Sequence, residues 1–186
     1  MAQAKSLKTP LTNDDLKDLK VGDKVVLNGP IYSARDAAHK RIVDLIGKNE
    51  KLPFDLKGAA VYYVGPAPAK PGQAIGSAGP TTSGRMDAYT PLLISKGLKA
   101  MIGKGPRSKE VKQAMKEHGA VYLAAIGGAG ALISKSITKA NVVAYEELGA
   151  EAIRLMEVKD LPLIVAIDMH GNDLYETGKE AYRKRA

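Results

Sequence analysis

The chain has no cysteine, no tryptophan and a single phenylalanine among its 186 residues. Without thiols it can form no disulfide, and it can hold no iron–sulfur cluster through thiolates of its own. No apolar run approaches the ~20 residues that a membrane-spanning helix needs. The first residues, Met1–Lys8, lack the apolar core of a signal peptide. These absences lead us to expect a cytoplasmic protein with no membrane partner.

Positive charge exceeds negative charge, with 28 Lys and Arg against 20 Asp and Glu and a net charge of +8. Nucleic-acid binding is one interpretation of such a balance. However, aromatic residues make up only 5% of the chain, so no platform for stacking bases is evident. The basic residues are also scattered, apart from the run Lys179–Arg185. We therefore favour attraction of small anions. A non-catalytic anion- or RNA-binding module remains the alternative from another class of function, and salt-sensitive RNA binding by the chain would support it.

The length and the apolar fraction of 45% predict one domain over residues 1–186 with a core of its own. Hydrophobic periodicity and turn residues predict alternating strands and helices in the middle of the chain, at 24–29, 36–48, 59–64, 86–96, 100–102, 108–117 and 120–126. Strand-like segments follow at 141–145, 152–158 and 163–168. This order indicates an α/β fold with a mixed sheet flanked by helices. Residues 1–12 are expected to form a loose or partner-bound arm.

The segment Gly79–Asp87 reads Gly-Pro-Thr-Thr-Ser-Gly-Arg-Met-Asp and leads directly into a predicted helix. Such a turn offers backbone N–H groups, hydroxyls and a guanidinium at one helix N-terminus, which predicts an anion site.

Three cations occupy equivalent places in the predicted fold. Arg35, Arg85 and Lys104 each follow a turn that contains Gly or Pro and comes after a predicted strand. Strand ends are where α/β sheets place their ligands, and an arginine can grip a carboxylate with two hydrogen bonds. Each residue taken alone favours a surface or helix-end role. The three together favour a pocket for a small polyanion.

Four polar residues near these cations have two interpretations each. The hydroxyls of Thr81 and Thr82 can cap the next helix, or one of them can point into the pocket and move a proton. Asp36 and His39 lie one helical turn apart. They can orient Arg35 or relay a proton, although an acidic residue at a helix start also stabilises the helix dipole.

Two further patterns carry less weight. Gly127–Gly130 follows a predicted strand as in dinucleotide-binding loops, but Ile133 stands where the third glycine would be. Asp168 and His170 offer a carboxylate and an imidazole without further ligands nearby, so no metal site is expected in this chain.

Four segments together resemble a known family, namely Gly29–Arg41, Gly79–Asp87, Met101–Gly105 and Ala125–Ala131. They are similar to the β subunit of class I fumarate hydratases, a unit that also forms the C-terminal domain of single-chain members. The β subunits of L-tartrate dehydratases are close relatives. The resemblance runs from about Gly22 to Tyr175 in the right order.

The resemblance implies a swivelling β/β/α domain and a hydro-lyase that interconverts fumarate and (S)-malate, with L-tartrate as the alternative substrate. It also implies an α subunit that carries a [4Fe-4S] cluster on three cysteines, in an assembly with two copies of each chain. A protein without cysteine agrees with that division of roles.

By the same resemblance, Arg35, Arg85 and Lys104 bind the carboxylates of a small dicarboxylate substrate, with Thr82 beside them. Thr81 matches the hydroxyl proposed as catalytic base, and Arg85 and Lys104 stabilise charge in the transition state. Which of the two threonines moves the proton stays open.

Overall fold

The computed structural model describes residues 4–183. Its strands are β1 (Lys5–Lys8), β2 (Lys24–Ser33), β3 (Ala60–Tyr62), β4 (Ala100–Gly103), β5 (Val121–Ala124), β6 (Ile137–Ala144) and β7 (Ile153–Ile167). Its α-helices are α1 (Asn13–Leu16), α2 (Asp36–Gly47), α3 (Thr90–Ser95), α4 (Lys109–His118), α5 (Gly130–Ile133) and α6 (Leu174–Tyr182). Three short 3-10 turns are η1 (Ser83–Met86), η2 (Ser134–Ser136) and η3 (Glu146–Glu151).

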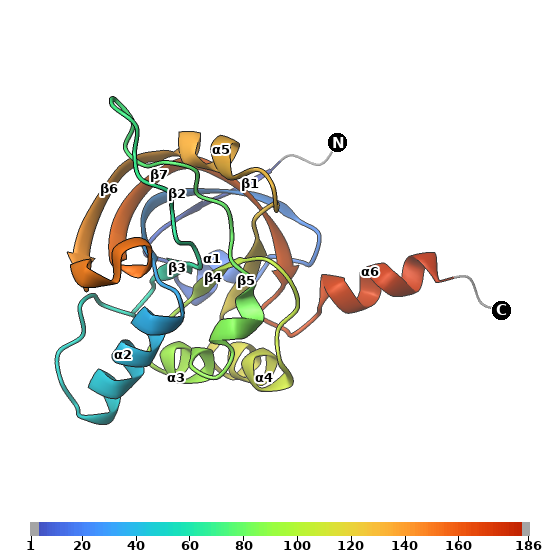
Figure 1. Cartoon of the computed structure of the whole chain (residues 1–186). Coiled ribbons are helices and arrows are strands. Elements are labelled where there is room, and N and C mark those ends of the chain that lie inside the picture. Colours follow the sequence, from blue (N-terminus) through green and yellow to red (C-terminus); the bar gives the residue numbers. More distant parts are fainter. Residues whose placement is uncertain (1–3, 184–186) are drawn as a thin grey trace.

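The strands form one mixed sheet in the order β1-β2-β3-β4-β5-β7-β6. Strands β1 to β5 run parallel, and β7 is antiparallel to its neighbours. Because β7 also pairs with β2, the sheet closes on itself around β2, β3, β4, β5 and β7. Figure 1 shows β1, β2, β7 and β6 curving over the side of the molecule opposite α2, α3 and α4. The expected mixed α/β fold with a helix-flanked sheet is confirmed.

Side chains of the central strands alternate between two cores, as the two-residue period of a strand requires. Tyr62 and Ile102 belong to the cluster inside the closed sheet, whereas Val61, Tyr63 and Met101 pack toward the helices. All five are completely buried. Burial of a large aliphatic or aromatic side chain contributes roughly 1.5–3 kcal/mol each, so the central strands are firmly held. Their carboxyl ends therefore form a rigid support for the loops that follow.

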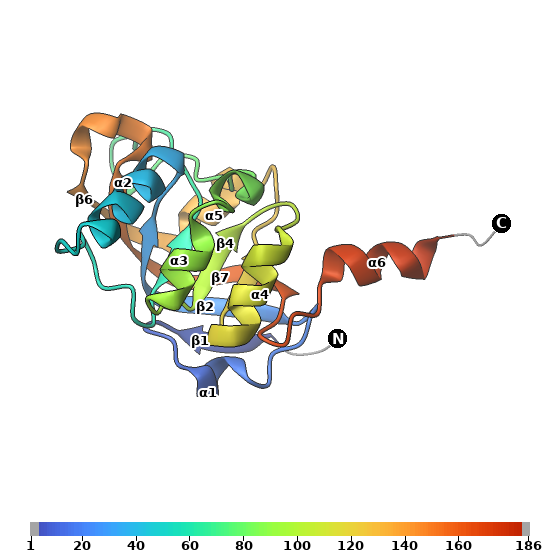
Figure 2. The same cartoon turned by 90° about the horizontal axis from the view of Figure 1, so that it is seen from below.

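Helices α2, α3 and α4 cover the outer face of the central strands (Figure 2). The sequence predicts α4 and its ends correctly. Ser108 accepts a hydrogen bond from Val111 N as N-cap, and Gly119 closes the helix in the left-handed conformation with φ 65°.

The helix predicted over 86–96 is wrong in its first half. The structure has the η1 turn there and begins α3 only at Thr90, with Pro91 in its first turn. Proline is tolerated in a first turn but removes a hydrogen bond further inside a helix. The helix N-terminus expected after Gly84 is therefore replaced by the short η1 turn, Ser83–Met86, and α3 follows it.

Two strand boundaries also need correction. The chain does not leave the sheet at Gly29-Pro30 but continues to Ser33, because Gly29 takes a φ of 96° and the register with β7 shifts there. Likewise, the segments 152–158 and 163–168 belong to one strand, β7. It passes an irregular point at Asp160, where the Asn28 side chain accepts the Asp160 N–H.

The loose or partner-bound arm expected over 1–12 is wrong for the described residues 4–12. Lys5–Lys8 pair with β2 as the edge strand β1, while Leu7 and Leu11 are buried. Thr9 Oγ1 donates to Pro30 O at 2.7 Å, so this segment packs against the chain's own sheet. Residues 1–3 lie outside the described part.

Helix α6 was not expected, and it projects away from the body in both views (Figures 1 and 2). Its base is held because Tyr175 Oη accepts a hydrogen bond from Gly105 N at 3.0 Å. Among residues 4–183, no helix has both the length and the apolar character that crossing a membrane requires.

Candidate functional site

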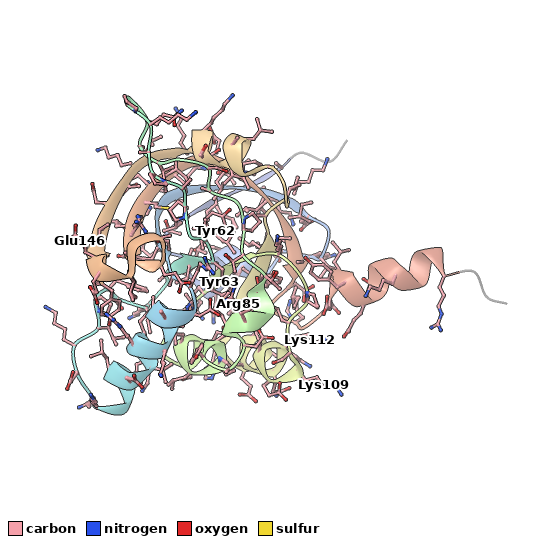
Figure 3. All side chains as sticks on the ribbon, in the orientation of Figure 1. Tyr62, Tyr63, Arg85, Lys109, Lys112 and Glu146 are labelled. Carbon is pink, nitrogen blue, oxygen red and sulfur yellow. The ribbon has the colours of Figure 1, made fainter. Side chains whose placement is uncertain are left out.

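The residues expected to bind an anion meet at one edge of the sheet. Strands β2, β3, β4 and β5 are parallel, so their carboxyl ends lie at the same edge. Arg35 follows β2, the loop with Thr81 and Thr82 follows β3, and Lys104 follows β4. Figure 3 labels Arg85 in η1, together with Tyr62 and Tyr63 at the end of β3.

One carboxylate lies between the two arginines. Asp36, the first residue of α2, accepts a hydrogen bond from Arg85 Nε at 2.9 Å through Oδ1. Its Oδ2 lies 3.9 Å from Arg35 Nη2. Asp36 thereby joins two cations that are 50 positions apart in sequence and offsets part of their mutual repulsion.

Arg35 is held from several sides. Its Nη2 lies 3.3 Å from Glu151 Oε1, and its side chain is only 21% exposed. A Cβ on Gly65 would lie 2.8 Å from Arg35 Nη1, so glycine is needed for this close approach. The Nε of Arg35 is buried and finds no hydrogen-bond partner among the described residues. The guanidinium is therefore fixed without all its donors being used.

The threonine loop runs beside the end of β4. Thr82 and Lys104 form a parallel bridge, and Ser83 N donates to Lys104 O at 2.9 Å. Thr81 N donates to Tyr63 O at 2.7 Å. Thr82 occupies the N-cap position of η1 but makes no side-chain cap bond, so the expectation that a hydroxyl caps this turn is wrong. Among residues 4–183, the Thr81 side chain is half-buried and the Thr82 side chain is exposed.

The glycine-rich loop after β5 supports this edge through close backbone packing. A Cβ on Gly130 would lie 2.8 Å from Gly79 N, and one on Gly127 would lie 3.8 Å from Lys104 Cδ. Gly130 is needed for the loop to pack this closely against the Gly79 turn, whereas a Cβ on Gly127 would make only an ordinary contact with Lys104. Close packing is thus a structural reason for the last glycine of this pattern.

His39 is fully buried under Arg35. Its Nδ1 donates to Arg35 O at 2.9 Å, and its ring meets Tyr63 edge-on at 5.3 Å between centroids. Burial lowers the pKa of His39 to about 4, so the ring is neutral near pH 7. His39 Nε2 has no hydrogen-bond partner in the described part of the chain. The structure thus places His39 as a support for the Arg35 backbone.

A buried arginine under the η1 turn escaped prediction. Arg107 Nε donates to Asp87 Oδ1 at 2.7 Å, Nη2 donates to Thr90 Oγ1 at 2.9 Å, and the guanidinium lies over the rings of Tyr63 and Tyr122. Asp87 Oδ2 also accepts from the Ser108 N–H at 2.7 Å. This pair ties η1 to the start of α4. In the sequence, the only indication of this ion pair is Asp87, the acidic residue that ends the Gly79–Asp87 motif.

Glu151 also escaped prediction, because it lies 116 positions from its partner Arg35. With Asp36 and Glu151 against Arg35, Arg85 and Lys104, the cluster keeps a net positive charge. Arg85 is 53% exposed and Lys104 is exposed, so the cluster is open to solvent on one side.

The sequence matches the family described as "Fumarase C-terminus" over residues 2–178. The protein named "Putative L(+)-tartrate dehydratase subunit beta" from Methanocaldococcus jannaschii is 45% identical over 181 residues, covering 94% of this chain and 93% of the relative. Fumarate hydratase 2 of Leishmania major is 43% identical over 91% of this chain, and the anaerobic class I fumarate hydratase of Escherichia coli is 42% identical over 87%. The match covers 30% of each of these two longer relatives. The chain therefore belongs to the fumarase C-terminus family, and the resemblance to class I fumarate hydratases and tartrate dehydratase β subunits is confirmed.

Proposed function

We propose that this chain is the β subunit of a hydro-lyase that interconverts fumarate and (S)-malate. The observation that carries the proposal is the cluster at the sheet edge, where Asp36 joins Arg35 to Arg85 and Lys104 follows the neighbouring strand. A dicarboxylate needs two cationic positions at fixed separation, and this edge supplies three cations on rigid supports. The domain would be of the swivelling β/β/α type and would act in the cytoplasm.

The reaction removes a proton from C3 of malate and hydroxide from C2, so a C2–C3 double bond forms and water is released. Loss of the C3 proton builds negative charge on the adjacent carboxylate. Arg85 and Lys104 stabilise that charge, because preorganised donors act most strongly where charge develops. Arg35 binds the other carboxylate of the substrate, whose charge changes less during the reaction.

Thr81 is the proposed base for the C3 proton, and Thr82 contacts the substrate beside it. A threonine hydroxyl is a weak base in water, so its role requires that the assembled site excludes water and that nearby cations stabilise the alkoxide. The Thr82 hydroxyl makes no cap bond to the η1 turn, which supports its proposed contact with substrate. Thr81→Ala should lower kcat while KM stays near normal, whereas Thr82→Ala should mainly raise KM. The reverse pattern would exchange the two roles.

The [4Fe-4S] cluster fits a partner subunit and not this chain, because no cysteine is present to ligate iron. When bound there, the cluster would supply a Lewis acid for the substrate hydroxyl. The exposed Ile126 and Leu132, at 62% and 66%, flank the loop that touches Lys104. We expect them to face the α subunit in an assembly with two copies of each chain.

L-Tartrate is the second candidate substrate, favoured by the relative whose length the chain matches almost completely. The test is to co-purify the α partner, reconstitute the complex and assay fumarate, (S)-malate and L-tartrate. A higher kcat/KM for malate than for tartrate supports the proposal, and the opposite order assigns the chain to tartrate. Fumarase activity from the isolated chain would contradict the subunit role. RNA binding that weakens steeply with salt would favour the non-catalytic alternative.

A further inference from the structure

Glu151 belongs neither to the motifs nor to the proposed chemistry, yet it contacts two parts of the site. It is the last residue of η3, the turn between β6 and β7. Its Oε1 lies 3.3 Å from Arg35 Nη2, and its Oε2 accepts a hydrogen bond from Ala37 N at 3.2 Å. One carboxylate thus contacts a substrate-binding candidate and the first turn of α2.

The start of α2 explains why an acceptor from elsewhere is needed. Arg35 occupies the N-cap position, but a guanidinium has only donors and makes no cap bond. The first N–H groups of a helix need acceptors. Glu151 provides one from a segment distant in sequence, and the same carboxylate then lies beside the Arg35 side chain.

The guanidinium of Arg35 has little freedom in this arrangement. Gly65 approaches one side, Asp36 lies near Nη2, and Glu151 lies closer to that same nitrogen. We infer that Glu151 is a positioning residue that fixes the Arg35 guanidinium for carboxylate binding. The inference rests on the proposed function for its effect on catalysis, but the orientation of Arg35 can be tested separately.

The chain contains a matched ion pair between the same two elements. Glu147 of η3 pairs with Arg41 of α2, and Arg41 also lies over the Tyr145 ring at 4.7 Å. Glu147→Gln therefore removes a carboxylate from η3 and an ion pair with α2 without touching Arg35. It controls for any general loosening of η3.

The first measurement follows the Arg35 side chain by ¹⁵N relaxation of its Nε–H group in the full chain, with Arg35→Lys identifying the signal. We expect an order parameter of about 0.8 in the unmodified chain and in Glu147→Gln, and one below about 0.6 in Glu151→Gln. Glutamine keeps the size and an acceptor for Ala37 N–H but removes the charge. A rigid Arg35 in Glu151→Gln overturns the inference.

The second measurement is steady-state kinetics of the complex with the α partner. Because Arg35 binds substrate and transition state alike, Glu151→Gln should raise KM about tenfold and leave kcat within about twofold. Glu147→Gln should leave both unchanged. In an Arg35→Lys background, Glu151→Gln should add no further effect, whereas a purely structural role would give additive losses. An equal KM in Glu151→Gln and unmodified enzyme, or additive losses, contradicts the positioning role.

The two proposals fail separately. If the assembled complex converts none of the three diacids, the proposed function is wrong, and the relaxation measurement still decides whether Glu151 holds Arg35.

Discussion

Asp36 accepts a hydrogen bond from Arg85 Nε at 2.9 Å and thereby joins the first turn of α2 to the η1 turn. The other oxygen of this carboxylate is buried, lies 3.9 Å from Arg35 Nη2 and has no hydrogen-bond partner among the described residues. The carboxylate therefore holds two like charges near each other. This relationship makes Asp36 the central acidic residue of the site.

Asp36→Asn should lower kcat/KM by roughly 10–100-fold, because charge-assisted hydrogen bonds contribute about 1.5–3 kcal/mol. The amide keeps the shape but no longer offsets the repulsion between Arg35 and Arg85. Steady-state kinetics on the assembled complex measures the effect. Asp44→Asn, at an exposed position of the same helix, is the control and should leave kcat/KM unchanged. Normal kcat/KM in Asp36→Asn would show that the arginines need no such bridge.

Arg85→Lys should lower turnover as well as affinity. Lysine keeps the charge but loses the planar fork that can bind a carboxylate through two N–H groups, and it cannot reproduce the Nε contact with Asp36. Loss of a preorganised donor at developing charge typically costs about 100–1000-fold in rate. Arg41→Lys, which lies on α2 and pairs with Glu147, is the control. Near-normal kcat in Arg85→Lys would remove Arg85 from the transition-state role.

Arg107→Met should destabilise the fold by about 3–5 kcal/mol, the usual cost of leaving one member of a buried ion pair unpaired. Asp87 would lose its partner, and Tyr63 and Tyr122 would lose the cation above their rings. Urea unfolding monitored by circular dichroism gives the free energy difference. The exposed Lys109→Met is the comparison. A loss below about 1 kcal/mol would mean that water replaces the guanidinium at little cost.

The sequence predicted the helix-flanked mixed sheet because long amphipathic segments and capping residues are local signals. Ser108 and Gly119 bound α4 as expected. The motifs also brought Arg35, Arg85 and Lys104 to one edge, because parallel strands share the direction of their ends. The closure of the sheet through β2 and β7 has no local signal, since it depends on pairing between segments about 130 residues apart.

The site residues that the sequence did not predict also lack a local signal. Glu151 and Arg107 contact partners that are distant in sequence, and neither residue lies in a motif. Strand β1 was not predicted from the sequence. It has four residues and a single buried side chain, Leu7, so its alternation is too short to distinguish it from a loop.

His39 should make stability depend on pH in a defined window. Its pKa is about 4 in the fold against 6.5 ordinarily, so the unfolded chain binds a proton first as pH falls. The contribution of His39 to the free energy of unfolding is complete above pH 6.5 and is lost as the pH falls from 6.5 to 4. The loss amounts to roughly 3 kcal/mol, because each pKa unit corresponds to about 1.36 kcal/mol. The free energies of unfolding of the unmodified chain and His39→Gln should therefore converge by that amount from pH 7 to pH 4. A constant difference would mean that His39 titrates alike in both states.

Gly65→Ala tests whether Arg35 must occupy its observed position. The added Cβ would lie 2.8 Å from Arg35 Nη1 and 3.2 Å from Cδ, so the guanidinium has to move. The obstruction involves the end of a flexible side chain, so the backbone can stay in place. We expect the free energy of unfolding to change by less than about 1 kcal/mol while KM for the diacid rises several-fold with little change in kcat. Gly47→Ala at the end of α2, where a Cβ meets nothing within 4 Å, is the control and should leave KM unchanged. An unchanged KM in Gly65→Ala would show that substrate binding tolerates a displaced Arg35 and would argue against its role as a carboxylate ligand.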